Sequence, residues 1–262
     1  MSQEPLRRSR SGSRRARGLA GKLEIALPEL LSLLRTGTLS VQELVPWSSN
    51  YTFFVIVSSG SHQVPAIYKP SRGERPLWDF PTGTLAKREY AAYLVSAALG
   101  WPQVPPTVLR DGPQGIGAVQ LFIDTVEGEH YFTLRDNHRE EMKRIAVFDA
   151  VVNNTDRKGG HVLLGREGGI WCIDHGVTFH EHPKLRTVIW DFTQEPIPAA
   201  LLDDLRKLQS KLDRSDSLAQ SLAPLLSARE LQALCYRIDT LLKEGVYPEP
   251  PEDWPHIPWP PI

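Results

Sequence analysis

Two aspartates, Asp156 and Asp174, flank a short segment with the pattern of a β-hairpin. Apolar residues at 162–164 and 170–173 form the predicted strands, and the glycine-rich stretch GREGG between them is typical of a turn. Antiparallel pairing of these strands places His161 beside the end of the second strand and returns Asp174 to the loop that begins at Asp156. Carboxylates gathered in so small a volume repel one another unless a cation bridges them. Their hard oxygens suit magnesium or manganese, with phosphate oxygens completing the coordination shell.

A plainer interpretation of the same hairpin stays open. Asn and Asp are common near turns, where their side chains bond to nearby backbone groups. The segment could therefore be a surface hairpin with Asx turns at its two ends.

A second pair of charged residues lies in the first half of the chain. Lys69 ends a predicted strand in the apolar sequence AIYKP. Glu89 lies on a predicted helix over residues 84–99, on the face that helical spacing assigns to the core. A carboxylate on such a face needs a positive partner, and Lys69 is the candidate; otherwise Glu89 lies at the rim and meets solvent or Arg88. The residues that share its face are Leu85, Ala92, Ser96 and Leu99.

Hydrophobic periodicity and turn residues predict the elements that must position these side chains. The first half reads as a short helix, a strand hairpin, a long helix and two further strands, and the second half is mainly helical. We therefore predict an α+β, two-lobed arrangement: a small β-rich N-lobe, a larger helical C-lobe and a ligand cleft between them. A strand Lys, a helix Glu, a loop Asp and an Asp after a hairpin follow one another in the order that protein-kinase-like phosphotransferases use, and this resemblance implies a protein-kinase-like fold. The predicted helices cover residues 23–35, 84–99, 138–152 and most of 198–244, and the predicted strands cover 51–57, 64–69, 107–110 and 118–124.

Composition divides the chain into four predicted regions. Residues 1–22 carry seven Lys or Arg against Glu4 and are rich in Ser and Gly, which predicts a disordered basic tail. We interpret this tail as a solvated extension, with contact to anionic lipid or nucleic acid as the alternative, and we do not expect a nucleic acid partner. The other regions are the N-lobe at 23–125, the C-lobe with its hairpin at 126–246, and a Pro- and Trp-rich C-terminal arm at 247–262.

Overall composition excludes several classes of protein. The 262 residues are 41% hydrophobic and 23% charged, which is ordinary for a globular chain. No run of about 18 apolar residues predicts a membrane span, and Lys22, Glu24 and Pro28 interrupt any secretory signal. The two cysteines, Cys172 and Cys235, fit neither a metal motif nor a disulfide scaffold, so we expect a cytoplasmic location.

Three segments resemble the signatures of a known family: YKPSRGERP (68–76), NTDRKGGH (154–161) and CIDHGVTF (172–179). In this order they are similar to the type II phosphatidylinositol 4-kinase branch of the phosphatidylinositol 3/4-kinase-like superfamily, with HipA-type kinases as more distant relatives. The whole chain also resembles a small group of bacterial phosphatidylinositol-kinase-related proteins. The absence of a Walker A motif excludes a P-loop nucleotide site.

The resemblance implies an atypical kinase-like phosphotransferase that uses ATP with magnesium or manganese. Lys69, held by Glu89, would contact the α- and β-phosphates. Asp156 would be the catalytic aspartate, and Asp174 would bind the metal. The residues implied to cover the phosphates are Ser48, Ser49 and Asn50, and those implied to form the interlobe hinge that meets adenine are Gln120, Leu121, Phe122 and Ile123.

One position departs from the family pattern. Relatives place an Asn, as a metal ligand, five residues after the catalytic aspartate, where this chain has His161. A neutral imidazole can bind a metal but suits manganese better than magnesium. Asn153 or Asn154 could supply the missing amide. Asp149, inside the apolar helix sequence AVFDAVV, is interpreted as a buried carboxylate that bonds the backbone of the catalytic loop.

Three functions therefore stay open. The leading one is phosphotransfer from ATP to an acceptor that could be a small molecule, a protein or a lipid headgroup. The glycine-free turn at 48–50 and the unusual His161 favour, as the alternative, an ATP-binding pseudokinase or a nucleotidyltransferase. The third is a metal hydrolase built on Asp174 and nearby histidines, although no HExxH or CxxC pattern supports it. The histidines concerned are His161, His175, His180 and His182.

Overall fold

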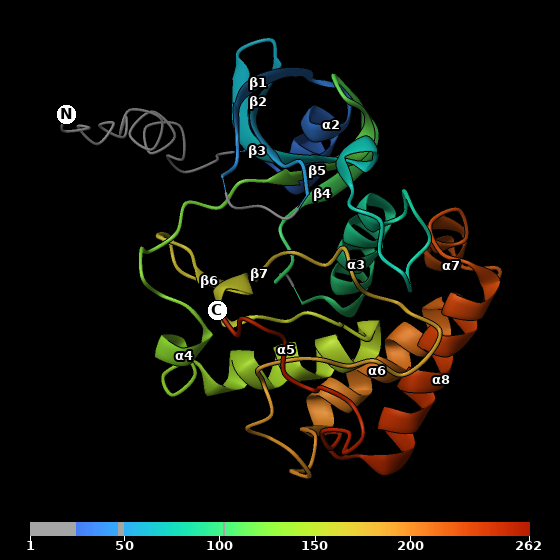
Figure 1. Ribbon diagram of the computed structural model, residues 1–262. Helices are drawn as coiled ribbons and strands as arrows, with labels where there is room; N and C mark the ends of the chain where they lie inside the picture. Colours follow the sequence, from blue (N-terminus) through green and yellow to red (C-terminus); the bar gives the residue numbers. More distant parts are fainter. Residues whose placement is uncertain (1–24, 47–49, 102) are drawn as a thin grey trace.

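The computed structural model describes residues 25–46, 50–101 and 103–262, and these form two lobes (Figure 1). One lobe is built around a β-sheet, and the other consists mainly of helices. The predicted tail at 1–22 and the predicted phosphate-covering residues Ser48 and Ser49 lie outside the described residues.

The smaller lobe contains a five-stranded antiparallel sheet in the order β1-β2-β3-β5-β4. Alternate residues of its central strands point inward, such as Val55 and Val57 on β2 and Val64 and Ala66 on β3. Helix α2 packs its leucines on this face and completes the core of the lobe (Figure 1). The elements are α2 (Leu27–Thr36), β1 (Thr38–Leu44), β2 (Phe53–Ser59), β3 (His62–Pro70), β4 (Thr107–Gly112) and β5 (Gly115–Leu121).

Strand β1 was not predicted, and its surroundings explain why. Its sequence, TLSVQEL, lies at the edge of the sheet and is almost fully exposed, so it lacks the apolar alternation that marks a half-buried strand. The short helix α4 (Tyr131–Leu134) was missed too, because four residues carry no helical period. The other predicted helices and strands are present, with ends that differ by a few residues.

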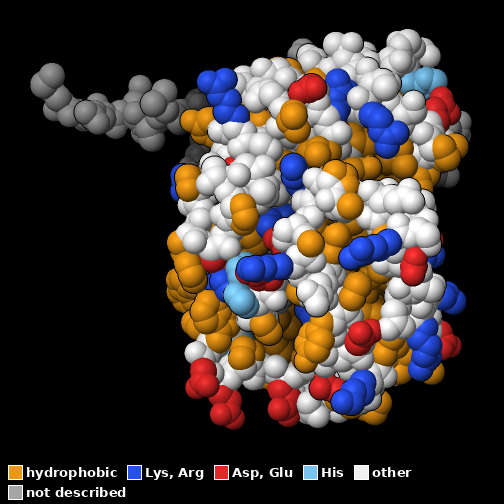
Figure 2. Space-filling view, turned by 90° about the vertical axis from the view of Figure 1, so that its right-hand side faces the viewer, with side chains coloured by type: hydrophobic (Ala, Val, Ile, Leu, Met, Phe, Trp, Pro, Cys, Tyr) orange, Lys and Arg blue, Asp and Glu red, His pale blue; other side chains and the backbone are white. Residues whose placement is uncertain are grey.

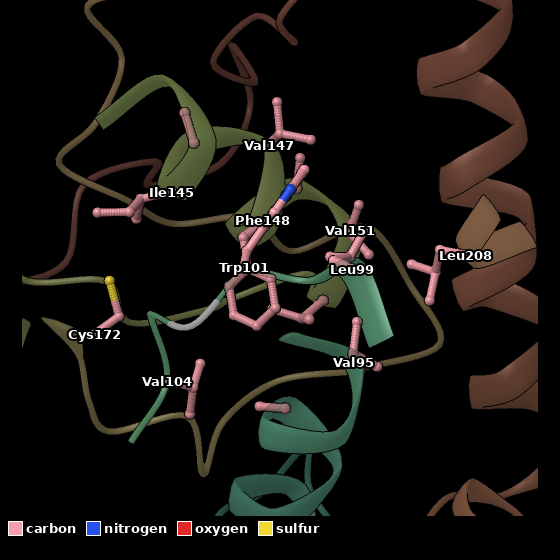
Figure 3. Packing of buried hydrophobic residues seen from close by; sticks show 14 of the residues in the cluster. Val95, Leu99, Trp101, Val104, Ile145, Val147, Phe148, Val151, Cys172 and Leu208 are labelled. Carbon is pink, nitrogen blue, oxygen red and sulfur yellow. The ribbon is translucent and has the colours of Figure 1, made fainter. Parts of the chain in front are cut away.

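The larger lobe forms around helix α5, which packs against α8, and residues of α3 and α6 contribute to the same buried core (Figure 3). Val95 and Leu99 of α3 face Phe148 and Val151 of α5, and Leu208 of α6 closes the cluster. The segment predicted as mainly helical contains three separate helices. The elements of this half are α3 (Leu85–Leu99), α5 (Arg139–Val152), β6 (Val162–Leu164), β7 (Ile170–Cys172), α6 (Ala199–Lys211), α7 (Ser217–Leu222) and α8 (Ala228–Glu244), with short 3₁₀ turns at Ser71–Gly73 and Gly159–His161.

Helix α3 is tied to the helical lobe by a buried ion pair. The Arg88 guanidinium, 1% exposed, donates to Glu230 of α8 at 2.5 Å and to the carbonyl of Thr178 at 2.6 Å. Because Glu230 also completes the capping box at the start of α8, both ends of this contact are anchored. The neighbouring residue on α3, Glu89, is thereby held at a defined place beside the sheet.

None of the helices in the described ranges is long and apolar enough to cross a membrane.

Candidate active site

A cavity of about 870 Å³ lies between the two lobes. Its walls come from β3, the end of β5, the loop that precedes α3, the start of α3, the loop after α5 and the end of the β6–β7 hairpin. Lys and Arg side chains are visible at mid-height on one face of the molecule, where the two lobes meet (Figure 2). The candidate residues described by the structure, from Asn50 through Asp174, all line this cavity.

Lys69 lies between two carboxylates in this cavity. Its ammonium donates to Glu89 Oε1 and, at 2.9 Å, to Asp174 Oδ1. Glu89 is 3% exposed and also accepts the backbone N–H of His175 through Oε2 at 3.0 Å. Lys69 is therefore the partner of the core-facing Glu89, as predicted. The alternative, in which Glu89 lies at a solvated rim, is not observed. Burial alone would lower the pKa of Lys69, but the carboxylates of Asp174 and Glu89 raise it above its ordinary value, so the ammonium stays charged.

The hairpin returns Asp174 to the loop that begins at Asp156, as the register predicts. Leu164 lies opposite Ile170, and the N–H of Ile173 donates to the carbonyl of His161 at 3.0 Å. Asp174 follows with a left-handed backbone (φ 64°), and its Oδ2 lies 3.4 Å from His161 Nε2. The Lys69 ammonium holds the pKa of Asp174 well below its usual range against the opposing effect of burial, so this half-exposed side chain is an anion.

Asp156 lies in the same cavity, on the loop after α5. Its backbone N–H donates to Asn154 Oδ1 at 3.0 Å, and its Oδ2 lies 3.5 Å from the ammonium of Lys158. Burial raises the pKa of Asp156 above its ordinary value, Lys158 opposes that shift, and Asp174 adds to it. Asp174 is therefore close enough to influence the ionisation of Asp156.

A buried ionic network supports this loop from behind. The guanidinium of Arg157, 0% exposed, binds both oxygens of Asp149 at 2.9–3.1 Å, donates to the Ile173 carbonyl at 3.0 Å, and lies 2.6 Å from His175 Nε2. Asp149 also accepts the side-chain amide of Asn154 at 3.0 Å. The buried carboxylate therefore bonds side chains of the loop, rather than its backbone as the sequence interpretation had it. Arg157 was missed, although an aspartate inside an apolar helix signals a nearby cation.

Breaking this network is expected to destabilise the fold. Arg157→Met leaves the Asp149 carboxylate buried without its cation, which should lower the free energy of unfolding by about 3–5 kcal/mol. Urea denaturation measures the loss, and Asp149→Leu/Arg157→Met should recover part of it because no charge is then stranded. Arg206→Met is the matched control, since its pair with Asp203 is exposed and should change stability by less than about 1 kcal/mol.

His161 is placed beside Asp174, with its ring orientation partly set by the backbone. Burial lowers the pKa of His161 to about 4, so the imidazole is neutral at pH 7. Its Nδ1 accepts the backbone N–H of Lys158 at 3.4 Å, which leaves the proton on Nε2, directed toward Asp174. In this tautomer His161 supports the carboxylate of Asp174. Ligation of a metal through Nε2 requires the proton to move to Nδ1.

The other polar candidates for metal binding are engaged elsewhere. The amide of Asn153 donates to the carbonyls of His180 and His182 at 3.0 and 2.8 Å, and that of Asn154 is held by Asp149. Among residues 25–46, 50–101 and 103–262, no group of three or more His, Cys, Asp or Glu side chains is arranged to hold a metal ion. A cation at Asp174 therefore needs oxygens from a ligand, such as phosphate, to complete its shell.

The predicted hinge residues form the end of β5 and the turn that follows it. The side chain of Gln120 is buried and donates to Thr107 Oγ1 at 2.9 Å, so it braces the strand rather than facing a ligand. The N–H of Leu121 donates to Pro106 at 2.8 Å, and that of Phe122 donates to Pro65 at 3.0 Å. Together with Ile123, these residues line the same cavity as Asp156. Asn50 lines it too, and its Oδ1 accepts the N–H of Arg75 at 2.8 Å.

The cavity has a second cluster that the sequence did not reveal. The ammonium of Lys184 lies 2.6 Å from Asp79 Oδ2, 4.5 Å from the centre of the Trp78 ring and 5.7 Å from that of Trp254. Arg186 lines the same side and lowers the pKa of Asp156. These residues come from three distant segments, so no local pattern relates them.

Comparison with known proteins adds the family. The family model described as phosphatidylinositol 3- and 4-kinase matches residues 108–245, more than half of the chain. Protein Rv2133c of Mycobacterium tuberculosis is 39% identical, over 87% of this chain and 94% of that protein. Phosphatidylinositol 4-kinase gamma 3 of Arabidopsis thaliana is 25% identical over 50% of this chain, which spans only 29% of the plant protein.

Solved structures agree with the two-lobed, kinase-like fold. The crystal structure of the Golgi casein kinase with Mn/ADP bound aligns with a TM-score of 0.55 at 14% identity, covering 83% of this chain and 75% of that one. The Helicobacter pylori proinflammatory kinase CtkA aligns with a TM-score of 0.51 at 14% identity, covering 82% and 94%. The predicted fold class and the predicted resemblance are both confirmed. By its match to the family model and to the mycobacterial relative, the chain belongs to the phosphatidylinositol 3- and 4-kinase family.

Proposed function

We propose that this protein is an ATP-dependent phosphotransferase that moves the γ-phosphate of ATP to a hydroxyl group of an acceptor. The observation that carries this proposal is the convergence in one interlobe cavity of Lys69, Glu89, Asp174 and Asp156. A positive group fixed by a buried carboxylate, next to an anionic carboxylate and a separate aspartate, is what phosphoryl transfer requires for positioning and charge neutralisation.

Each group has a role that its geometry supports. The ammonium of Lys69, charged and held by Glu89, would contact the α- and β-phosphates. Asp174 is half-exposed and anionic, and it would hold a divalent metal ion together with phosphate oxygens. When bound, that metal would neutralise charge on the transferring phosphate. His161 would orient Asp174 or, in its other tautomer, share the metal.

Asp156 would act on the acceptor. It lines the cavity from the C-lobe, and Leu121, Phe122 and Ile123 at the end of β5, which line the same cavity, would receive adenine. A carboxylate of raised pKa can orient the acceptor hydroxyl and accept its proton. In this arrangement the triphosphate would lie between Asp156 and the residues that receive adenine.

The structural relatives support nucleotide and metal use. The Golgi casein kinase, which shares this fold, is known with Mn/ADP bound. We extend this to ATP with magnesium or manganese as the cofactors here. We do not extend the acceptor in the same way. The plant relative is named as a phosphatidylinositol 4-kinase, but this chain spans less than a third of that protein.

Calorimetric titration with ATP, in magnesium, in manganese and without metal, is the test of this function. We expect binding that requires a divalent metal, and no binding with either metal would overturn the proposal. ATP labelled on either phosphate then separates the alternatives. Transfer of a label on the γ-phosphate to water, protein or an added acceptor indicates phosphotransfer. Transfer of a label on the α-phosphate to protein or an added acceptor, with release of pyrophosphate, indicates nucleotidyl transfer. Metal-dependent binding with neither reaction indicates a pseudokinase.

The pH dependence of turnover should respond to Lys158. A base at Asp156 must be ionised, so the rate falls as the pH drops through its pKa. Because Lys158 lowers that pKa, Lys158→Met should move the acidic limb of the pH–rate profile to higher pH. Lys158→Arg keeps the charge and should leave the limb in place, and the exposed Lys207→Met should have no effect. An acidic limb unmoved by Lys158→Met would argue against Asp156 as the titrating base.

A further inference from the structure

The C-terminal arm contacts the loop that follows Asp156. The backbone N–H of Gly159 donates to the carbonyl of Pro261 at 2.7 Å. The carbonyl of His256 accepts the N–H of Thr187 at 3.0 Å and the indole N–H of Trp190 at 3.1 Å. The end of the chain accordingly lies beside the β6–β7 hairpin (Figure 1). This arm lies beyond residues 108–245, so the family match assigns it no role.

The part of the loop at residues 158–160 depends on such contacts because, unlike the buried Arg157 before it, it has little side-chain packing of its own. Its sequence runs Lys158, Gly159, Gly160, and glycine loses more conformational freedom on ordering than any other residue. On one side the loop is held by the 186–188 segment, which exchanges backbone hydrogen bonds with Arg157 at 3.0 and 3.1 Å. The arm holds the loop at Gly159 through the Pro261 carbonyl, and it holds the 186–188 segment through the His256 carbonyl.

The contact at Gly159 is close. A Cβ added there would lie 2.7 Å from the ring of Phe132 and 3.3 Å from the Pro261 carbonyl oxygen. The backbone of the loop is thus packed between helix α4 and the last residues of the arm. The ring of Phe132 therefore leaves no room for a side chain at Gly159, while the Pro261 oxygen of the arm lies close on the other contact.

The arm also supplies part of the cavity wall. The half-buried Trp254 lines the cavity together with Asp156, and its ring lies near the ammonium of Lys184, which is paired with Asp79 from the loop before α3. Trp254 therefore connects the C-terminal arm to the N-lobe loop across the cavity. Asp156 lines the same cavity.

We propose that residues 254–262 are a functional part of the acceptor side of the active site. The carbonyls of His256 and Pro261 position the loop that carries Asp156, and Trp254 forms a wall against which the acceptor binds. This proposal rests on the phosphotransfer function proposed above. It makes the arm a positioning element, since none of its groups is required to touch the transferring phosphate.

The first test uses a variant that lacks only residues 259–262 and so stops at residue 258. This variant loses the Pro261 carbonyl but retains Trp254 and His256. Hydrogen exchange followed by mass spectrometry should show exchange in residues 155–164 faster by about fivefold, the effect of one lost hydrogen bond of about 1 kcal/mol. Peptides from β2 and β3 are the internal reference and should not change. Unchanged exchange in 155–164 would overturn the positioning role.

The second test compares binding with turnover. The shortened variant should bind ATP with an affinity within about twofold of wild type and transfer the γ-phosphate more slowly, by on the order of 10- to 100-fold, as expected for a small misplacement of a reacting group. Trp254→Ala should also slow transfer while leaving loop exchange unchanged. Tyr236→Ala, which removes an exposed aromatic ring from α8, is the control and should match wild type.

Two outcomes would contradict the proposal, and neither is confused with failure of the proposed function. Transfer that becomes faster on shortening would make the arm an inhibitory plug. Transfer within twofold of wild type in both variants would show that the arm has no role in the transfer reaction. If wild type binds no ATP with either metal, the phosphotransfer function and the acceptor wall fail together, and the exchange measurement alone still decides whether the arm holds the loop.

Discussion

Asp174→Asn is expected to abolish metal-dependent ATP binding and to slow phosphoryl transfer by about a thousandfold or more. The substitution keeps the shape of the side chain and removes its charge, which the Lys69 ammonium, 2.9 Å away, keeps fully developed in the native protein. A bound metal contributes several kcal/mol of charge stabilisation in phosphoryl transfer, and each 1.36 kcal/mol is tenfold in rate.

Calorimetry with ATP in magnesium and in manganese measures the first effect, and release of labelled γ-phosphate measures the second. ATP without metal should bind wild type and variant equally weakly, which separates loss of the metal from damage to the nucleotide pocket. Asp203→Asn is the matched control, because Asp203 forms an exposed pair with Arg206 on α6. An Asp174→Asn protein that binds magnesium–ATP within twofold of wild type would show that the metal is held elsewhere.

The parts of the site that could be predicted from sequence are those with a local period. Glu89 is separated from Leu85 and Ala92 by helical spacings, so its burial follows from the face that it shares. The return of Asp174 to His161 follows from the pairing of two short strands across a turn. In both cases the geometry is set by residues within about 20 positions of one another, and repeating backbone geometry carries it.

The parts that could not be predicted depend on contacts between distant segments. Trp254 reaches the cavity from an arm without helix or strand, so no period reports its direction. The same holds for the pair of Arg88 and Glu230, which joins α3 to α8 over 142 positions of sequence. Arg157 illustrates a signal that was available: a carboxylate in an apolar helix predicts a cation, but the sequence does not say which one.

The supports of the site form one continuous structure behind the cavity. Glu89 accepts the backbone N–H of His175, whose ring contacts Arg157, which in turn is bound by Asp149 at the end of α5. The helix that fixes Lys69 is thereby linked to the loop that carries Asp156 through buried groups. Because these groups are buried and hydrogen-bonded to one another, the two halves of the site are held at a fixed distance rather than by flexible side chains.

Asp156→Asn should separate catalysis from binding. The side chain is not bonded to Lys69 or Glu89, so metal-dependent ATP affinity should stay within about twofold of wild type. Transfer should fall by on the order of 10²–10⁴-fold, because an amide can accept a hydrogen bond from the acceptor but cannot take its proton at neutral pH. The remaining rate should lose the acidic limb that we assign to the pKa of Asp156.

Three measurements decide this prediction: ATP titration, single-turnover transfer of the γ-label, and the pH–rate profile of the residual activity. Asp124→Asn is a suitable control, since that aspartate is paired with Arg166 and does not line the cavity. Equal loss of ATP affinity and rate would mean that Asp156 serves the nucleotide or its metal instead of the acceptor. In that case Asp156 would share the ion with Asp174, which already raises the pKa of Asp156, and the two carboxylates would form a single cation site.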